Sequence, residues 1–427
     1  MSKIRVAVFP ADAVNATEVH DALSSCVNIE VWGLSSVKRH GPYVFRNYRS
    51  DLPMANDPGF YDALESVVEE LGIDVIVPTH DTVLLELAKN RERLSARVMA
   101  PCARTAELCR SKRLTYEALS GEPFIPKNYC SASEVLSFPV FAKPDKGQGA
   151  VGASVVRSAK ELSSVDFSES VVTEYLPGRE FTVDCLTDVD GNLVVVSPRE
   201  RVRIWAGISA EARIVPLTEE VRRIAETINE KVKFQGLWFF QVKEDSAGRM
   251  KLMEVSARCA GTMCATRALG YNLPLMSVYT TMGVRVSALR GGYGVVVDRE
   301  LESRYALSLD YDAVFIDYDD TVVFGDDVNP SAIRFLYQCR RNGIPVTLLT
   351  RHEGDLTESL ESHAISSNLF ARIEHLAGGE PKAGYIDPTT KPIFIDNAFA
   401  ERAEVSKGLG IPVFDVSEIP MLIDMRS

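Results

Sequence analysis

The strongest constraint on the fold is that short apolar runs alternate with helical patterns at both ends of the chain. Near the start, the apolar runs cover residues 5–9, 29–34, 75–77 and 97–99. Near the end, they cover residues 313–316, 344–349 and 392–395. Short apolar strands that alternate with amphipathic helices are typical of parallel sheets covered by helices. The sequence therefore predicts such a layered sheet at each end.

The stretch between these ends has a different pattern. Residues 104–282 contain hairpin-like strands, a glycine-rich loop and two helical patterns, which is typical of an α+β domain. A charged connector at 298–304 precedes the last apolar runs. A length of 427 residues favours about three domains. We expect an α/β and α+β multidomain protein: a Rossmann-like domain at 1–103, a mixed domain at 104–295 and a Rossmann-like domain at 305–427.

Composition excludes several classes of function. The chain carries 47 Lys and Arg against 59 Asp and Glu, a net charge of −12, which disfavours nucleic-acid backbones and basic membrane patches. No stretch approaches the roughly 18 apolar residues of a membrane span, and the start lacks a signal-peptide pattern. Eight cysteines are scattered without a CxxC pair, which favours reduced thiols. We expect a cytoplasmic protein without a nucleic-acid or membrane partner.

A lysine and several glycines suggest a phosphate site in the middle domain. Lys143 ends an apolar run and precedes a loop that contains Gly147, Gly149 and Gly152. Such a loop can direct backbone N–H groups at phosphate oxygens, while the lysine supplies a positive charge. A tight hairpin would show the same glycines about as often. The pattern therefore predicts a phosphate cradle or a plain hairpin.

Two further segments carry polar groups that suit a bound nucleotide. Glu174 and the backbone at Leu176 could bond to an adenine edge, and Glu180 to a ribose, although a hairpin with solvated acids explains them too. Further along the chain, two apolar strands are predicted near residues 236–242 and 251–255. Polar residues interrupt or follow these strands: Gln241, Glu254, Ser256 and Arg258. Buried charges are costly without partners, and a magnesium ion with bound phosphates would satisfy them.

In this order, the segments resemble the ATP-grasp superfamily, in particular the branch similar to the carbamoyl phosphate synthetase large subunit, over about residues 1–285. The resemblance implies ATP and Mg²⁺ as cofactors. It implies that the phosphates are held by Lys112, Lys143 and the loop of Gly147 and Gly149, and the nucleoside by Glu174, Leu176 and Glu180. It also implies a metal site of Gln241, Glu254 and Ser256, where the family usually has Asn at the last position, and a charge-stabilising role for Arg258.

The reaction implied by this resemblance activates a carboxylate with the γ-phosphate of ATP, and an amine then attacks the acyl phosphate. ADP leaves, and the partners are a small carboxylic acid and an amine. Arg201 and Arg203 are predicted to bind an anionic substrate, although an exposed strand face explains the basic run equally well. Residues 78–81 follow a predicted strand, where open sheets bind ligands, but the lone histidine there is more often structural. The alternative is a kinase-like or nucleotide-sensing module that regulates the last domain.

The last domain carries a second set of polar residues at the ends of apolar runs. Asp317 and Asp319 follow residues 313–316, Thr350 and Asp396 each close an apolar run, and Lys382 lies between these two. The carboxyl ends of parallel strands meet at one edge of a sheet. The sequence therefore predicts that these five side chains converge.

These residues resemble the four motifs of the haloacid dehalogenase superfamily of phosphatases. The resemblance implies hydrolysis of a phosphate ester with Asp317 as nucleophile, Asp319 as acid and base, and Thr350 and Lys382 holding the phosphoryl group. It implies Mg²⁺ on Asp317, the Asp319 carbonyl and Asp396. A predicted helix from Pro330 to Gly343, capped by Asn329, leaves no room for a cap domain. The open pocket would admit a bulky ester, or another domain or subunit would close it, which makes a homo-oligomer possible.

Overall fold

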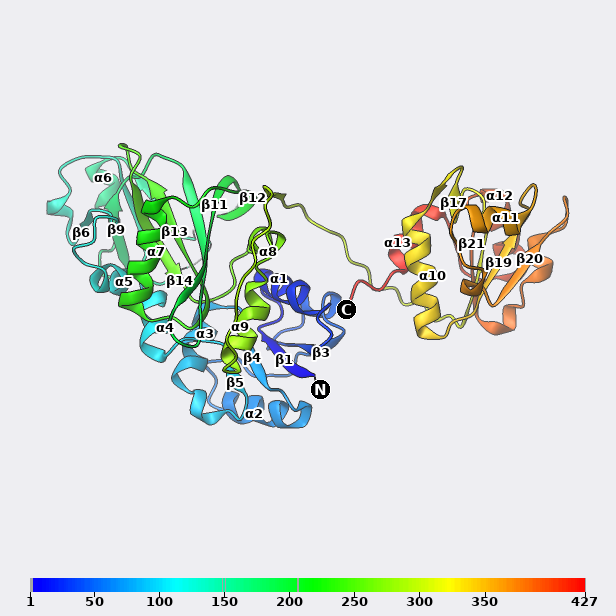
Figure 1. The fold of residues 1–427 in the computed structure, drawn as a ribbon, viewed down its shortest axis with the longest axis horizontal. Coiled ribbons are helices and arrows are strands. Elements are labelled where there is room, and N and C mark those ends of the chain that lie inside the picture. The colour runs from blue at the N-terminus through cyan, green and yellow to red at the C-terminus, as the bar shows by residue number, and fades with distance from the viewer. Residues whose placement is uncertain (1–2, 148, 150, 206, 427) are drawn as a thin grey trace. The chain divides into compact units, whose positions relative to one another are not determined.

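A computed structural model of the chain describes residues 3–147, 149, 151–205 and 207–426. The chain divides into two compact units, one formed by Met1–Leu301 and one by residues 302–426 (Figure 1). The first unit contains both segments that the sequence assigns to the leading and middle domains. Each unit is described by itself below.

The first unit begins with a five-stranded parallel sheet, so the sheet expected at this end is confirmed. Its strand order is β3 (Asn47–Arg49), β2 (Ile29–Leu34), β1 (Ile4–Phe9), β4 (Val75–Pro78) and β5 (Arg97–Val98). Its helices are α1 (Val14–Leu23), α2 (Phe60–Leu71) and α3 (Asp81–Lys89). Alternate residues of β1 enter two apolar clusters, with Phe9 in one and Val8 in the other. Both faces of this sheet are therefore buried.

Two antiparallel sheets follow in the same unit. The four-stranded sheet has the order β6 (Asn128–Tyr129), β9 (Ser170–Glu174), β7 (Val140–Pro144), β8 (Ser154–Val156). The six-stranded sheet has the order β14 (Met250–Ser256), β13 (Gly236–Glu244), β10 (Glu180–Thr187), β11 (Leu193–Trp205), β12 (Ile208–Ile214), β15 (Val296–Asp298). The helices are α4 (Ala103–Arg110), α5 (Lys112–Ala118), α6 (Ala159–Leu162), α7 (Glu219–Val232), α8 (Cys264–Ala268) and α9 (Leu273–Thr281).

Helix α7 shows why the six-stranded sheet is covered on one side. Its buried residues recur at helical spacing, from Val221 through Ile224 and Ile228 to Val232. They share one apolar cluster with Trp238 of β13, and α7 runs along the sheet (Figure 1). On the opposite face, Leu237 and Phe239 join a second apolar cluster with residues of α9. The polar side chains of this face form the site described below.

The second unit contains another five-stranded parallel sheet. Its order is β20 (Arg372–His375), β19 (Val346–Thr350), β16 (Ala313–Ile316), β21 (Pro392–Ile395), β22 (Val413–Phe414). A small hairpin of β17 (Val323–Phe324) and β18 (Asp327–Val328) precedes helix α10 (Pro330–Asn342). The other helices are α11 (Leu356–Ser362), α12 (Phe399–Leu409) and α13 (Ile419–Leu422). The predicted helix at 330–343 is confirmed, with Asn329 accepting N–H bonds at its start and Gly343 in the left-handed conformation at its end.

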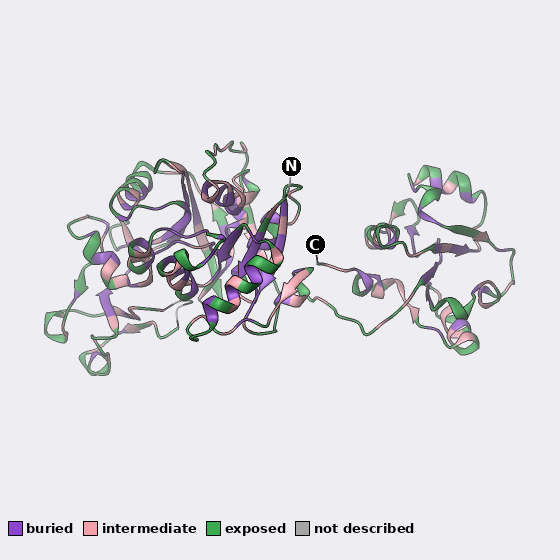
Figure 2. Ribbon diagram, turned by 90° about the horizontal axis from the view of Figure 1, so that it is seen from below, coloured by how far each residue is buried: buried purple, intermediate pink, exposed green. Residues whose placement is uncertain are grey.

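Burial is concentrated on the sheets of both units, where the strands are mostly purple in Figure 2. The cysteines are all free thiols. Within the described ranges, no helix combines the length and apolar character that crossing a membrane requires.

Candidate functional site

The first unit contains a cavity of about 540 Å³ between the two antiparallel sheets and the leading parallel sheet. Nine residues that the sequence assigns to ATP, metal or substrate line it: Lys112, Lys143, Gly147, Gly149, Glu180, Arg201, Gln241, Glu254 and Arg258. Residues two apart on a strand share a face, and this places Glu180 with Thr182, and Gln241 with Lys243, on the cavity side. The apolar residues between them, Phe181 and Val242, belong to the same apolar cluster as the buried residues of α7.

Lys143 lies on β7 and is buried against neutral oxygen atoms. Its Nζ donates to the Tyr116 hydroxyl at 2.9 Å and to the Met253 carbonyl at 2.7 Å. Burial lowers the pKa of Lys143 to about 8, although the charge of Glu254 opposes this shift. A cation without a bonded carboxylate is poised to attract an anionic ligand.

Lys112 is the first residue of α5 and approaches the glycine-rich loop. Its Nζ donates to the Asp145 carbonyl at 3.2 Å and to the Gly147 carbonyl at 3.5 Å, and burial lowers its pKa. Gly149 has φ +63°, a left-handed conformation that favours glycine. Lys112, the loop and Lys143 thus border the same part of the cavity.

Gln241 and Glu254 are direct neighbours on β13 and β14. Within the described residues, no side chain or backbone group donates a hydrogen bond to the Glu254 carboxylate, and the charges of Lys112, Lys143 and Arg258 act on it. Amide and carboxylate oxygens are suitable ligands for Mg²⁺, which usually completes its shell with phosphate oxygens and water. The pair therefore fits a metal that arrives with a polyphosphate.

Arg258 and Ser256 are both bonded to Asp81, the first residue of α3. The Arg258 Nε donates to Asp81 Oδ2 at 2.9 Å, and the Ser256 hydroxyl donates to Asp81 Oδ1 at 2.8 Å. Burial pushes the pKa of Asp81 up, but Arg258 and the hydrogen bond from Ser256 hold it below its usual value. Ser256 faces a small pocket beside the main cavity, which it shares with Glu254 and Arg258.

Glu180 and Arg201 form a closely paired, buried ion pair beside Gln241. Arg201 also donates to the Gly207 carbonyl at 2.9 Å, and Lys243 Nζ lies 3.6 Å from the second oxygen of Glu180. The acid predicted to bind ribose and the arginine predicted to bind substrate are therefore partners of each other.

Besides Ser256, which faces the small pocket, three predicted residues are outside the cavity lining. The Glu174 carboxylate accepts a hydrogen bond from the Lys127 N–H at 2.9 Å. Leu176, two positions later, is buried, and neither residue lines the cavity. Arg203 is half exposed and pairs with Asp298 and Glu211. The register of β11 against β12 shifts between Arg201 and Arg203, so a β-bulge breaks the alternation that would place both arginines on one face.

The cavity also has charged residues that motif reasoning did not single out. Arg199 is 1% exposed and holds Asp184 through two bonds of 2.9 and 3.0 Å, and Arg299 lines the cavity from just beyond β15. Arg199 could have been found from the sequence, because it precedes Arg201 by two positions on the same strand. Arg299 carries no such signal, and the position of Asp81 after a strand of the leading sheet suggested a ligand site but not its contact with Arg258.

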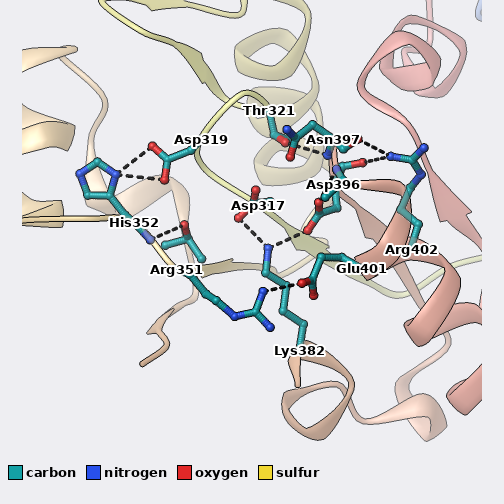
Figure 3. Close-up of polar contacts among 12 residues, drawn as sticks. Asp317, Asp319, Thr321, Arg351, His352, Lys382, Asp396, Asn397, Glu401 and Arg402 are labelled. Carbon is teal, nitrogen blue, oxygen red and sulfur yellow. Dashed lines mark hydrogen bonds and ion pairs between the residues drawn. The ribbon is translucent and has the colours of Figure 1, made fainter. Parts of the chain in front are cut away.

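The second unit brings together Asp317, Lys382 and Asp396 at the carboxyl edge of its parallel sheet (Figure 3). The Lys382 Nζ lies 2.8 Å from Asp317 Oδ1 and 2.6 Å from Asp396 Oδ2, and all three side chains are buried. Burial raises the pKa of Asp317 to about 6, against the lowering effect of Lys382. Two carboxylates around one ammonium leave a net negative charge that a divalent cation could neutralise.

Asp319 and Thr350 lie at the same edge but have other partners. The Asp319 carboxylate is about half exposed and lies 2.8 Å from His352 Nδ1. The buried Thr350 hydroxyl accepts from the His352 N–H at 3.1 Å. Arg351 pairs with Glu401 at 2.6 Å (Figure 3). His352 and Arg351 were not singled out from the sequence, although they directly follow Thr350.

No three His, Cys, Asp or Glu side chains lie close enough to hold a metal by themselves in the part of the chain that the structure describes. A metal at either site would therefore need backbone, amide, water or phosphate oxygens as additional ligands. The resemblance-based assignment of the Asp319 carbonyl as a ligand is compatible with this requirement.

The comparisons with known proteins address the first unit. A family model described as "ATP-grasp in the biosynthetic pathway with Ter operon" matches residues 166–298. The ADP complex of N5-carboxyaminoimidazole synthetase from Staphylococcus aureus has a TM-score of 0.58 at 14% identity, covering 70% of this chain and 83% of that one. The L-amino acid ligase from Bacillus licheniformis has a TM-score of 0.53 at 18% identity, covering 67% and 76%.

A third similar structure is the biotin carboxylase domain dimer of 2-oxoglutarate carboxylase from Hydrogenobacter thermophilus, solved with MgADP, ADP and bicarbonate. It has a TM-score of 0.54 at 16% identity, covering 69% of this chain and 74% of that one. No curated protein sequence matches the chain. The predicted ATP-grasp fold is confirmed, and ATP and Mg²⁺ are the typical cofactors of proteins with this fold.

Proposed function

We propose that the chain is a bifunctional biosynthetic enzyme. Its first unit would join a small carboxylic acid to an amine with ATP, and its second unit would hydrolyse a phosphate ester. The observation that supports the first activity best is the grouping of Lys112, Lys143 and Arg258 around Glu254 in one cavity of an ATP-grasp fold. Two lysines, an arginine and a carboxylate without a hydrogen-bonded partner suit a triphosphate and its divalent cation.

In the proposed ligation, an oxygen of the substrate carboxylate attacks the γ-phosphorus of ATP. The bond from this phosphorus to the β,γ-bridging oxygen breaks, and ADP leaves. The amine nitrogen then attacks the acyl carbon, a C–N bond forms, the C–O bond to the phosphate breaks, and the nitrogen loses a proton. Lys112 and Lys143 would hold phosphate oxygens, and Arg258 would stabilise the charge on the transferring group.

The metal and nucleoside contacts complete this proposal. A bound magnesium ion would neutralise phosphate oxygens, and Gln241 and Glu254 would hold it. Glu180 would accept from the ribose hydroxyls once its pairing with Arg201 adjusts, and Glu174 and Leu176 remain predictions for the adenine side. Arg299, which also lines the cavity, would receive the carboxylate of the acid, whereas Thr79 and Arg199 are already bonded to other groups of the protein.

For the second unit, the supporting observation is the group formed by Asp317, Lys382 and Asp396. An oxygen of Asp317 would attack the phosphorus of the ester and form an aspartyl phosphate, while Asp319 gives a proton to the departing alkoxide. Water would then attack the phosphorus, lose its proton to Asp319 and release Asp317. Lys382 and Thr350 would hold phosphoryl oxygens; in support, the Lys382 ammonium is bonded to Asp317, and Thr350 ends β19 beside the strand that precedes Asp317.

The test is an ADP-formation assay of the full chain with MgATP and a panel of carboxylic acids, with and without amines. The Asp317→Asn variant is used beside the wild type, so that phosphate released by the second unit does not enter the measurement. ADP that requires both acid and amine supports ligation. Hydroxylamine, which traps acyl phosphates as hydroxamates, should replace the amine.

Two other outcomes would favour the alternatives. A phosphorylated product that persists without an amine would indicate a kinase-like reaction. Nucleotide binding without substrate-dependent ADP across the panel would indicate a sensing module. The phosphatase proposal is tested separately with p-nitrophenyl phosphate, whose hydrolysis must depend on Mg²⁺ and disappear in Asp317→Asn.

A further inference from the structure

Asp81 begins a helix that follows a strand of the leading parallel sheet, and its carboxylate bonds to Arg258, which lines the main cavity. It follows β4 and is the first residue of α3. The turn before it is tied to the end of β1, because Thr79 donates its N–H to the Phe9 carbonyl at 3.0 Å and its hydroxyl to the Pro10 carbonyl at 2.7 Å. Asp81 is therefore presented by a rigid junction rather than a loose loop.

The contacts of Arg258 fix the direction of its guanidinium. Asp81 holds Nε at 2.9 Å, and the Cys259 carbonyl accepts from Nη1 at 3.1 Å. The Phe239 ring packs against the group, with its centroid 5.4 Å from Cζ. Among the described residues, no acceptor is bonded to Nη2. Arg258 lines the cavity, so this nitrogen is the one left for a ligand.

Ser256 fixes the other side of the Asp81 carboxylate. Its hydroxyl donates to Oδ1, the oxygen that Arg258 does not use, and its side chain is buried. With both oxygens bonded, the carboxylate cannot rotate without losing one of the two contacts. Ser256, Arg258 and Asp81 thus form one rigid group.

We infer that Asp81 is a positioning residue for phosphoryl transfer, which holds Arg258 so that its free nitrogen meets the transferring group. This inference rests on the proposed function of the first unit. Asp81 acts through Arg258 and contacts no reacting atom. The leading sheet therefore contributes to the chemistry and does not only flank it.

A competing interpretation is that Asp81 only ties the leading sheet to β14. The two interpretations differ when Arg258 is altered. A structural tie would keep its importance whatever residue occupies position 258. A positioning effect would vanish once the arginine that is positioned has been replaced.

The first experiment measures kcat and KM for ATP in Asp81→Asn, which keeps the side-chain shape but removes the charge. We expect kcat to fall about 10- to 100-fold, because a misplaced catalytic group costs rate, and KM to change less than about threefold. The matched control is Asp62→Asn, which breaks an exposed pair with Arg93 in the same unit and should leave kcat unchanged. Equal kcat in Asp81→Asn and wild type would overturn the inference.

The second experiment repeats the substitution in an Arg258→Gln background, in which position 258 no longer carries a cation for Asp81 to hold. We expect Asp81→Asn to change kcat less than about twofold there, because its effect in the wild type passes through Arg258. The same 10- to 100-fold loss in both backgrounds would establish the structural tie instead. Should Asp81→Asn fail to fold, Asp81→Glu keeps the charge while displacing the carboxylate by one methylene, and a kcat loss at unchanged KM supports the inference.

A binding measurement separates this inference from the proposed function. Calorimetric titration of MgADP with and without aluminium fluoride, which mimics the transferring phosphoryl group, should show tighter binding with fluoride in the wild type. In Asp81→Asn, the ratio of the affinities measured with and without fluoride should be at least about tenfold smaller than in the wild type, while the affinity for MgADP alone stays the same. An undiminished gain in the variant overturns the inference alone, whereas a wild type that gains nothing contradicts phosphoryl transfer itself and removes the basis of both.

Discussion

The two candidate sites hold a buried lysine in opposite ways. Lys143 is surrounded by neutral oxygens from Tyr116 and Met253, and its pKa is lowered to about 8. Lys382 lies between the carboxylates of Asp317 and Asp396. The positive charge of Lys143 has no carboxylate bonded to it and is available to an anionic ligand. The positive charge of Lys382 is exceeded by the negative charges of its two carboxylate partners.

This difference indicates what each site is prepared to receive. The first site presents cations to an incoming polyanion, so its charges act most strongly before the nucleotide binds. The second site presents excess negative charge, so under the proposed phosphatase function a divalent cation would have to bind before or with the phosphate ester. Both proposals involve phosphoryl transfer. In the first site the protein's cations compensate the charge of the ligand, whereas in the second site a bound cation would first compensate the charge of the protein.

The largest expected effect comes from removing the proposed nucleophile. Asp317→Asn should lower p-nitrophenyl phosphate hydrolysis by at least about 10³-fold, because an amide oxygen does not form the covalent intermediate. ADP formation by the first unit should not change. Asp326→Asn, an exposed acid in the nearby turn, is the control. Hydrolysis that survives in Asp317→Asn would contradict the nucleophile assignment and break the comparison.

Replacing the other lysine tests the first half of the comparison. Lys143→Met should reduce kcat/KM for ATP by roughly 10²- to 10³-fold in the ADP assay, because a phosphate contact of full charge is lost in a buried site. Ester hydrolysis should remain at the wild-type level. A loss below fivefold would show that Lys143 does not contact the nucleotide.

The same substitution at both lysines should have different effects on stability. Lys382→Met leaves two buried carboxylates without a cation, so it should destabilise the second unit by about 3–5 kcal/mol in EDTA, and Mg²⁺ should restore part of this. Lys143→Met should cost about 1 kcal/mol or less, since Tyr116 still donates to the Met253 carbonyl. Calorimetry of the full chain with and without MgCl₂ measures both. Similar losses in the two variants would contradict the charge comparison.

The lowered pKa of Lys143 predicts a pH dependence with a definite sign. Phosphate binding needs the protonated amine, and burial makes this form disappear above pH about 8 in the free enzyme. The value of kcat/KM for ATP should therefore fall about tenfold per pH unit on the alkaline side. In Lys143→Arg this limb should disappear, because arginine stays charged to a pH above about 12. A limb at the same pH in both proteins would assign it to another group.

How much of this could be predicted from the sequence differs between the two units. In the second unit, parallel strands end beside one another, so the positions of Asp317 and Asp396 follow from the strand pattern alone. The helix at 330–342 also follows from local signals, with Asn329 before it and Gly343 after it. Only the partners of these residues, such as His352 beside Asp319, required coordinates.

In the first unit, local signals located the strands that carry the site but not the groups that come from elsewhere. Lys143, Gln241 and Glu254 could be predicted because each interrupts an apolar run. Asp81 could not be assigned to this centre, because it lies 177 positions before Arg258 and only packing of the leading sheet brings them together. The basic run of β11 was misleading for another reason, because a β-bulge between Arg201 and Arg203 cannot be recognised from the sequence of the strand.

Arg201 and Arg203 are two apart on β11, and a regular strand would direct both into the cavity. The bulge between them directs Arg203 to the surface, where it is half exposed and paired with Asp298 and Glu211. Arg203→Ala should therefore change kcat/KM for ATP and for the acid less than about twofold, as is usual for a surface ion pair. Arg201→Ala, assayed beside it, should have a larger effect, because Arg201 touches Glu180 and Gln241 in the cavity. Suppose that Arg203→Ala lowered kcat/KM for the acid as much as Arg201→Ala. Arg203 would then have to enter the cavity when substrate binds, which requires β11 to lose its bulge, and the substrate-bound cavity would differ from the one described for the first unit.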